Sequence, residues 1–208
     1  MGIANDERAA LIELMERLGP EAPTLCAGWQ TRELAAHLIV RERRPDVAPG
    51  IVIKPLSGLV DRAMRDYAGK PWPDLLRLLR EGPPWWSVFA IDAINDRLNV
   101  VEFFVHHEDV RRGAAGWEPR PPDGRRDAVL WKALGFVGRG MYRRSPVGVV
   151  LRRPDGAEHS VRSGPRRVVV AGTPGELLLH AYGRDQVRVD LQGEPAAVQA
   201  LQRSPRGL

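Results

Sequence analysis

The chain has 208 residues, enough for one domain with a sizeable core or for one domain with a small appendage. Apolar residues at 43% and charged residues at 27% are typical of a globular protein, and no apolar run approaches the ~20 residues that a membrane span needs. The net charge of +5 is compatible with a nucleic-acid partner, but basic residues are scattered among nearly as many acidic ones, so we expect neither a nucleic-acid nor a membrane partner.

The N-terminal part of the chain has the pattern of amphipathic helices. Its first residues lack the basic and apolar regions of a signal peptide, which favours a cytoplasmic protein. Apolar spacing predicts a helix over residues 5–18 and a second one over residues 32–44, which is capped by Thr31 and carries His37. Cys26, in the loop between them, is the only cysteine, so it excludes an internal disulfide, and the sequence shows no partner that would activate its thiol.

The rest of the chain changes character near residue 145. Further helices are predicted over residues 56–67, over a short stretch after Asp74, over residues 90–112 and over residues 127–143. Beyond them, short valine-rich strands alternate with turn sequences and two short helices. Helices followed by mixed strands predict a mainly α protein, with a helical bundle over residues 1–145 and a small α/β segment over residues 146–208.

The most informative pattern is a polar stripe on the helix predicted over residues 90–112. On a helical wheel its five members fall in one arc roughly 80° wide, with apolar residues on both sides. They are Asn95, Asn99, Glu102, His106 and Asp109. Such a stripe is typical of polar groups turned into a protein interior, where they need partners or a metal because unpaired burial costs several kcal/mol. Glu102 and His106 are four residues apart, so their side chains are neighbours that can bind one ion together.

This stripe and His37 suggest a metal site. Two histidines and a carboxylate from two helices form the ligand set of a zinc-type site whose fourth position stays open for water or substrate. Asp109 or Asn99 would then orient the ligand imidazoles. The spacing alone favours equally a buried Glu-His pair that is satisfied by hydrogen bonds and binds nothing. His37, taken alone, is more typical of an ordinary helix histidine than of a ligand.

Three stretches of the sequence carry a family resemblance. They are Thr24-Leu-Cys-Ala-Gly-Trp-Gln-Thr-Arg-Glu-Leu-Ala-Ala-His-Leu38, Val101-Glu-Phe-Phe-Val-His-His-Glu-Asp-Val-Arg-Arg112 and Gly172-Thr-Pro-Gly-Glu-Leu-Leu-Leu-His-Ala-Tyr-Gly-Arg184. In this order they resemble the mycothiol-dependent maleylpyruvate isomerase family of the DinB-like superfamily, with the closest likeness to a metal-binding subgroup. Residues 45–90, which would shape a substrate pocket, match nothing in that family.

The resemblance implies a DinB-like up-down four-helix bundle in which His37, Glu102 and His106 bind a divalent metal. Zinc is the expected metal, with nickel or another divalent cation as the alternative, and the small thiol mycothiol is the expected second cofactor. Arg184 would bind a carboxylate of the cofactor or substrate by a bidentate pair. Asp109 would contribute to catalysis by fixing His106.

These observations predict a metal-assisted, thiol-dependent transferase or isomerase that acts on a small electrophilic substrate. The metal would hold the thiol as a thiolate, and the thiolate would attack an electrophilic carbon. The expected partners are the small thiol and the substrate, and the expected state is a monomer or a homodimer. The alternative is a non-catalytic metal- or ligand-binding regulator, which is favoured if Trp85 and Trp86 close the open coordination position.

Overall fold

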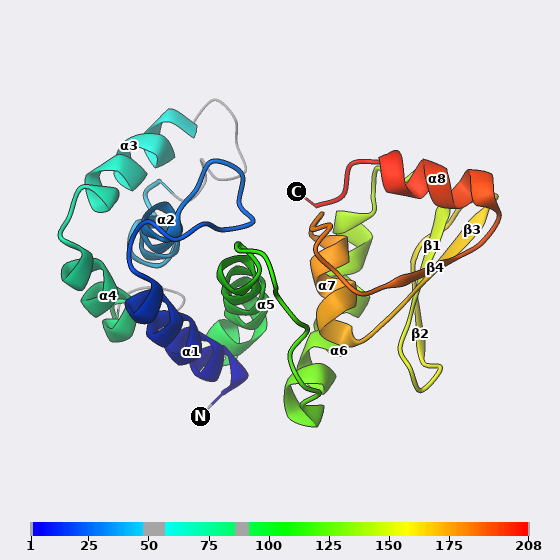
Figure 1. Cartoon of the computed structure of the whole chain (residues 1–208), viewed down its shortest axis with the longest axis horizontal. Helices are drawn as coiled ribbons and strands as arrows, with labels where there is room; N and C mark the ends of the chain where they lie inside the picture. Colours follow the sequence, from blue (N-terminus) through cyan, green and yellow to red (C-terminus); the bar gives the residue numbers. More distant parts are fainter. Residues whose placement is uncertain (1, 48–56, 86–91, 208) are drawn as a thin grey trace. The chain divides into compact units, whose positions relative to one another are not determined.

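The computed structural model describes residues 2–47, 57–85 and 92–207, and within the last range it leaves the side chains of residues 92–98 undescribed. These parts of the chain form eight helices and one four-stranded sheet, divided between two compact units, residues 1–117 and 118–208 (Figure 1). Among the described residues, no helix is both long enough and apolar enough to cross a bilayer.

The first unit is entirely helical in its described residues. Its helices are α1 (Ile3–Leu18), α2 (Thr31–Arg43), α3 (Ser57–Ala68), α4 (Trp72–Glu81) and α5 (Asp92–Arg111). Helix α1 lies along α5 and also contacts α4, while α2 packs against α3 and α4. The up-down four-helix bundle implied by the resemblance stays a prediction, because this unit contains five helices and these contacts do not single out four of them.

The core of the first unit is built from the apolar faces of α1, α2, α4 and α5. Its largest fully buried side chains are Leu11, Met15, Leu34, Leu38, Ile39, Leu75, Leu79 and Phe103. Each such side chain contributes about 1.5–3 kcal/mol by leaving water. Cys26 and Trp29, in the loop between α1 and α2, pack against the same core. The loop between α1 and α2 is therefore held against the helices that form this core.

Helix α2 begins in a different way from the one predicted. Gln30 is the N-cap residue, and its backbone N–H donates to the Glu33 carboxylate at 3.0 Å. Thr31 is already helical, and its hydroxyl donates to the backbone oxygen of Gly19 at 2.6 Å. The predicted cap was wrong by one residue, because the threonine hydroxyl ties the end of α1 to the start of α2 instead.

The second unit joins three helices to a small sheet in its described residues. Its elements are α6 (Gly124–Met141), β1 (Gly148–Arg152), β2 (Glu158–Arg162), β3 (Arg167–Ala171), α7 (Pro174–Ala181), β4 (Asp190–Gln192) and α8 (Pro195–Arg203). The strand order is β2-β1-β3-β4, with β1 and β3 parallel and the other two pairs antiparallel. The expectation of a mainly helical protein with strands confined to its C-terminal part is confirmed.

The division between the units falls earlier than the expected boundary after residue 145. Helix α6 belongs to the second unit, where it packs against α7 and β2. Two glycines allow this close approach: a Cβ at Gly138 would lie 2.7 Å from Val161 Cγ1, and one at Gly135 would lie 3.1 Å from the His159 ring. The helical periodicity of α6 does not indicate which neighbour the helix packs against, so the sequence-based prediction assigned it to the helical bundle.

Candidate metal centre

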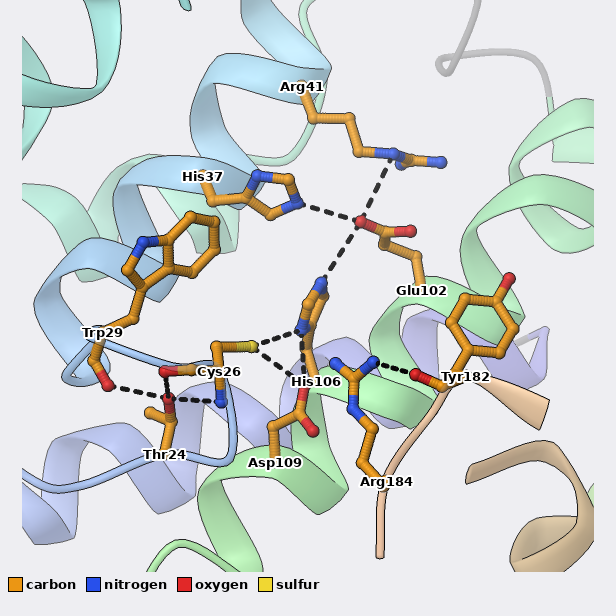
Figure 2. A network of polar contacts seen from close by, with 10 residues as sticks. All are labelled: Thr24, Cys26, Trp29, His37, Arg41, Glu102, His106, Asp109, Tyr182 and Arg184. Carbon is orange, nitrogen blue, oxygen red and sulfur yellow. Dashed lines mark hydrogen bonds and ion pairs between the residues drawn. The ribbon is translucent and has the colours of Figure 1, made fainter. Parts of the chain in front are cut away.

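Helices α2 and α5 bring together the three side chains predicted to bind a metal (Figure 2). Oε1 of Glu102 lies 3.1 Å from Nε2 of His37 and 3.3 Å from Nε2 of His106. The two imidazole rings meet edge to face, with centroids 5.2 Å apart. One ligand atom from each residue therefore faces a common point, as the helical wheel predicts for Glu102 and His106.

The geometry of this cluster fits a tetrahedral cation. Metal–ligand bonds of about 2.0–2.2 Å require ligand atoms about 3.3–3.6 Å apart, and the two distances to Glu102 are close to this range. The side chains of His37, Glu102 and His106 are 15%, 21% and 11% exposed. Solvent or a small ligand can therefore reach the cluster. Two imidazoles and one carboxylate with an accessible fourth position are the ligand set of a catalytic zinc site.

The electrostatics of the cluster follow from its burial and its pairing. Burial by itself would raise the pKa of the Glu102 carboxyl, but hydrogen bonds from the two imidazoles and the charge of Arg41 hold this pKa well below its ordinary range. Burial would also lower the pKa of His106, yet its hydrogen bonds, that with Asp109 first, raise this pKa well above the ordinary value. Without a cation these two shifts favour a carboxylate at Glu102 and an imidazolium at His106, so we expect a metal to replace a proton of His106.

Asp109 lies on the other side of the His106 ring. Its Oδ2 is 2.9 Å from Nδ1 of His106, and the carboxylate is completely buried. This contact occupies Nδ1 and turns Nε2 toward Glu102 and His37. The arrangement is the one expected of a carboxylate that orients a ligand imidazole.

Cys26 is the residue at this site that the sequence did not connect with it. Its thiol donates to Oδ2 of Asp109 at 3.2 Å and lies 3.9 Å from Nδ1 of His106. The loop is held in place because the backbone N–H of Leu25 donates to the backbone oxygen of Asp109 at 3.0 Å. The thiol also sits within a turn in which the backbone N–H of Cys26 donates to the Thr24 hydroxyl at 3.1 Å.

A second layer of polar contacts extends the stripe toward α1. The guanidinium of Arg41 lies 3.6 Å from Glu102 and donates to the side-chain oxygen of Asn99. The amide of Asn99 donates to Glu42 at 3.3 Å, and Arg8 donates to the same carboxylate at 2.8 Å. Asn99 therefore contacts Arg41 and Glu42, two residues that the sequence did not single out.

The remaining predicted residues belong to the second unit, are exposed, or lie outside the described parts of the chain. Arg184 belongs to the second unit, where it follows α7 and donates to the backbone oxygen of Tyr182 at 2.7 Å. Its expected role toward a thiol or substrate stays a prediction. Trp85 is 90% exposed, so it does not close the open coordination position as the regulator alternative would require. Trp86 and the side chain of Asn95 lie outside the described residues.

The fold and this cluster define a mainly helical protein of two units with a candidate divalent-metal centre in its helical unit. Two solved structures share the fold, and both are crystal structures of mycothiol-dependent maleylpyruvate isomerase, one of them a histidine-to-alanine mutant. The mutant superimposes with a TM-score of 0.62 at 14% sequence identity, and the other structure with 0.57 at 18%. Each comparison covers 92% of this chain and 91% of the other.

These comparisons confirm the resemblance seen in the sequence at the level of the fold. No family model matches the chain. No curated protein matches it either. Because a fold can carry many functions, the activity must be argued from the site.

Proposed function

We propose that the protein binds a divalent metal and uses it with an external low-molecular-weight thiol, of the mycothiol type, to isomerise or to conjugate a small electrophilic substrate. The observation that carries this proposal is the convergence of His37, Glu102 and His106 on one accessible point. The two structures that share the fold support it, since their names specify a mycothiol-dependent isomerase.

Each residue of the cluster has a distinct part in this proposal. His37, Glu102 and His106 would bind the metal through Nε2, Oε1 and Nε2, a donor set that suits zinc, with nickel as the alternative. Asp109 would keep the proton of His106 on Nδ1, so that Nε2 stays free for the cation. When bound, the metal would lower the pKa of a thiol that occupies the open position and hold it as a thiolate.

Two charged residues complete the proposal. Arg41 contacts Glu102 and would balance part of the negative charge of the carboxylate. Arg184 would bind a carboxylate of the thiol or the substrate through its planar guanidinium, which pairs well with two oxygens at once. The reaction needs a nucleophile from outside the chain, so it should not depend on the protein's own thiol at Cys26.

Elemental analysis of the purified protein is the first test. We expect one divalent metal per chain, and we expect His37→Ala and Glu102→Ala to lose it while far-ultraviolet circular dichroism keeps the same helical content. The matched control is His159→Ala, which removes a histidine from the second unit, where the ring stacks on Trp131. Retention of full metal in both site variants would place the metal elsewhere and refute the proposed ligand set.

A thiol-conjugation screen is the second test. The metal-loaded protein should consume mycothiol in the presence of a small electrophile, and Cys26→Ser should keep this activity because the nucleophile is external. A protein that binds one metal per chain and turns over no thiol with any electrophile would instead be the non-catalytic regulator. Loss of all activity in Cys26→Ser would refute the external nucleophile.

A further inference from the structure

Both nitrogens of the His106 ring face groups that can bind a cation. On one side, Nε2 lies 3.3 Å from Glu102, which it shares with His37. On the other side, Nδ1 lies 2.9 Å from Asp109 and 3.9 Å from the sulfur of Cys26. A neutral imidazole carries its proton on one nitrogen and binds a metal through the other. The His106 ring can therefore bind a cation through either nitrogen.

The donor set on the Nδ1 side has the dimensions of a metal site. Its three distances are 2.9 Å between Nδ1 and Asp109, 3.2 Å between Asp109 and the Cys26 sulfur, and 3.9 Å between that sulfur and Nδ1. Bonds of about 2.0–2.3 Å to oxygen, nitrogen and sulfur require ligand atoms about 3.3–3.7 Å apart. Side-chain shifts of a few tenths of an ångström would thus bring all three atoms to one cation.

The three donors of this set differ in their exposure to solvent. Asp109 is completely buried, but Cys26 is half-buried and lies in the loop between α1 and α2, with its sulfur directed at His106 and Asp109 (Figure 2). A cation would enter from the side of the sulfur and meet the buried carboxylate last. The buried negative charge next to a thiol favours an arriving cation over a neutral molecule.

We propose that a thiophilic divalent cation binds to Cys26, His106 and Asp109 in a second position that excludes a metal from the first. Thiolate sulfur selects soft cations, whereas the imidazoles and carboxylate of the first position suit harder ones. In the second position Nε2 keeps a proton and donates it to Glu102, so Glu102 and Asp109 exchange the roles of ligand and orienting group. Binding forms bonds from the cation to sulfur, Nδ1 and oxygen, and it releases the thiol proton and the Nδ1 proton to solvent.

The two positions exclude each other because they share one ring. Simultaneous binding at Nδ1 and Nε2 would require the imidazole to lose both of its protons and bridge the two cations as an imidazolate, which is disfavoured at neutral pH. This exclusion rests on the proposed function, since it assumes that the first metal uses His106. A soft cation would therefore prevent metal binding at the first position by occupying His106.

Cadmium titration of the full, metal-free chain tests this inference. Cadmium bound to the sulfur gives an ultraviolet charge-transfer band, and we expect this band to saturate at one Cd²⁺ per chain. Cys26→Ser should abolish the band, and Asp109→Asn should weaken the affinity by at least about tenfold, as expected for a ligand. His37→Ala, the matched control from the first position, should leave both the band and the affinity unchanged. If the cadmium affinity measured from this band falls in His37→Ala and stays unchanged in Asp109→Asn, the proposed second position is refuted.

Competition between metals tests the exclusion. When cadmium is added to the zinc-loaded protein, we expect one Zn²⁺ to be released for each Cd²⁺ that gives the charge-transfer band. A protein that holds zinc and sulfur-bound cadmium together, two metals per chain, would refute the exclusion. The proposed function fails by a different result, namely zinc that survives His37→Ala and Glu102→Ala, so the two failures are distinguishable.

Discussion

Metal affinity should depend on pH, because the proton of His106 competes with the cation. The pKa of His106 is raised well above its ordinary value despite burial, chiefly by its hydrogen bond with Asp109, so we expect the ring to hold its second proton near neutral pH in the metal-free protein. The pKa of Glu102 is held well below its ordinary range, so this carboxylate is already ionised and adds no pH dependence near neutrality. One proton must therefore leave for each metal that binds.

The magnitude follows from this count of protons. Below the pKa of His106, each pH unit should raise the apparent zinc affinity about tenfold, or about 1.4 kcal/mol, and above that pKa the affinity should level off. The assay is zinc competition against a chelator of known pH dependence, from about pH 6 to about pH 8, supported by calorimetry in two buffers of different ionisation enthalpy. Calorimetry should show the release of about one proton per metal.

The Asp109→Asn variant tests most directly whether the proton of His106 causes this pH dependence. The amide removes the charge that holds the proton on His106, so the pKa of the ring should fall and the pH dependence should flatten. His159→Ala, a change outside the centre, should keep the original slope. Zinc affinity that is constant across the whole range, with no proton released, would refute the assignment of a protonated His106 to the metal-free state.

Three further predictions concern stability. Arg8→Met should destabilise the first unit by about 3–5 kcal/mol in urea denaturation, because it removes the guanidinium that pairs with the carboxylate of Glu42, which is 2% exposed; a loss below 1 kcal/mol would contradict this. Burial and the nearby charge of Arg206 lower the pKa of His180 to about 3. As the pH falls, the unfolded chain therefore binds a proton at a higher pH than the folded chain does. The free energy of unfolding of the second unit should decrease by up to about 1.4 kcal/mol per pH unit below about pH 6.5. His180→Gln should remove this decrease. Gly113→Ala should cost about 1–3 kcal/mol, because its Cβ would lie 2.1 Å from the backbone oxygen of Pro23; unchanged thermal melting would exclude that clash.

Local periodicity was enough to predict the part of the site that lies on one helix. Glu102 and His106 are one turn apart, and Asp109 follows at a spacing of three, so any regular helix places them on one face. His37 came from the family resemblance and from its position on an amphipathic helix. These residues could be found because helical geometry relates positions that are close in sequence.

Contacts between distant segments could not be found in this way. Cys26 is separated from His106 by 80 residues, and Arg8 from Glu42 by 34, and no spacing rule connects such positions. The same limit explains the displaced unit boundary, since the glycines of α6 only acquire a meaning once β2 lies against them. A cysteine, an arginine or a glycine in a single sequence looks the same whether it is structural or part of a site.

The polar contacts between α1, α2 and α5 also determine how far these helices can slide. Two faces of leucine and valine fit one another in several registers, whereas hydrogen-bonded partners fit in one. A slide of α2 along α5 by one turn, about 5.4 Å, would separate Arg41 from Asn99 and Asn99 from Glu42, and would break the hydrogen bonds of the buried Asn99 and Glu42 to these partners. The alignment of His37 with Glu102 is thus fixed by neighbours of which only Arg41 contacts a proposed metal ligand. A chain redesigned with apolar residues at these positions could gain stability and still fail to bind metal, because apolar contacts would not define a single alignment of α2 with α5.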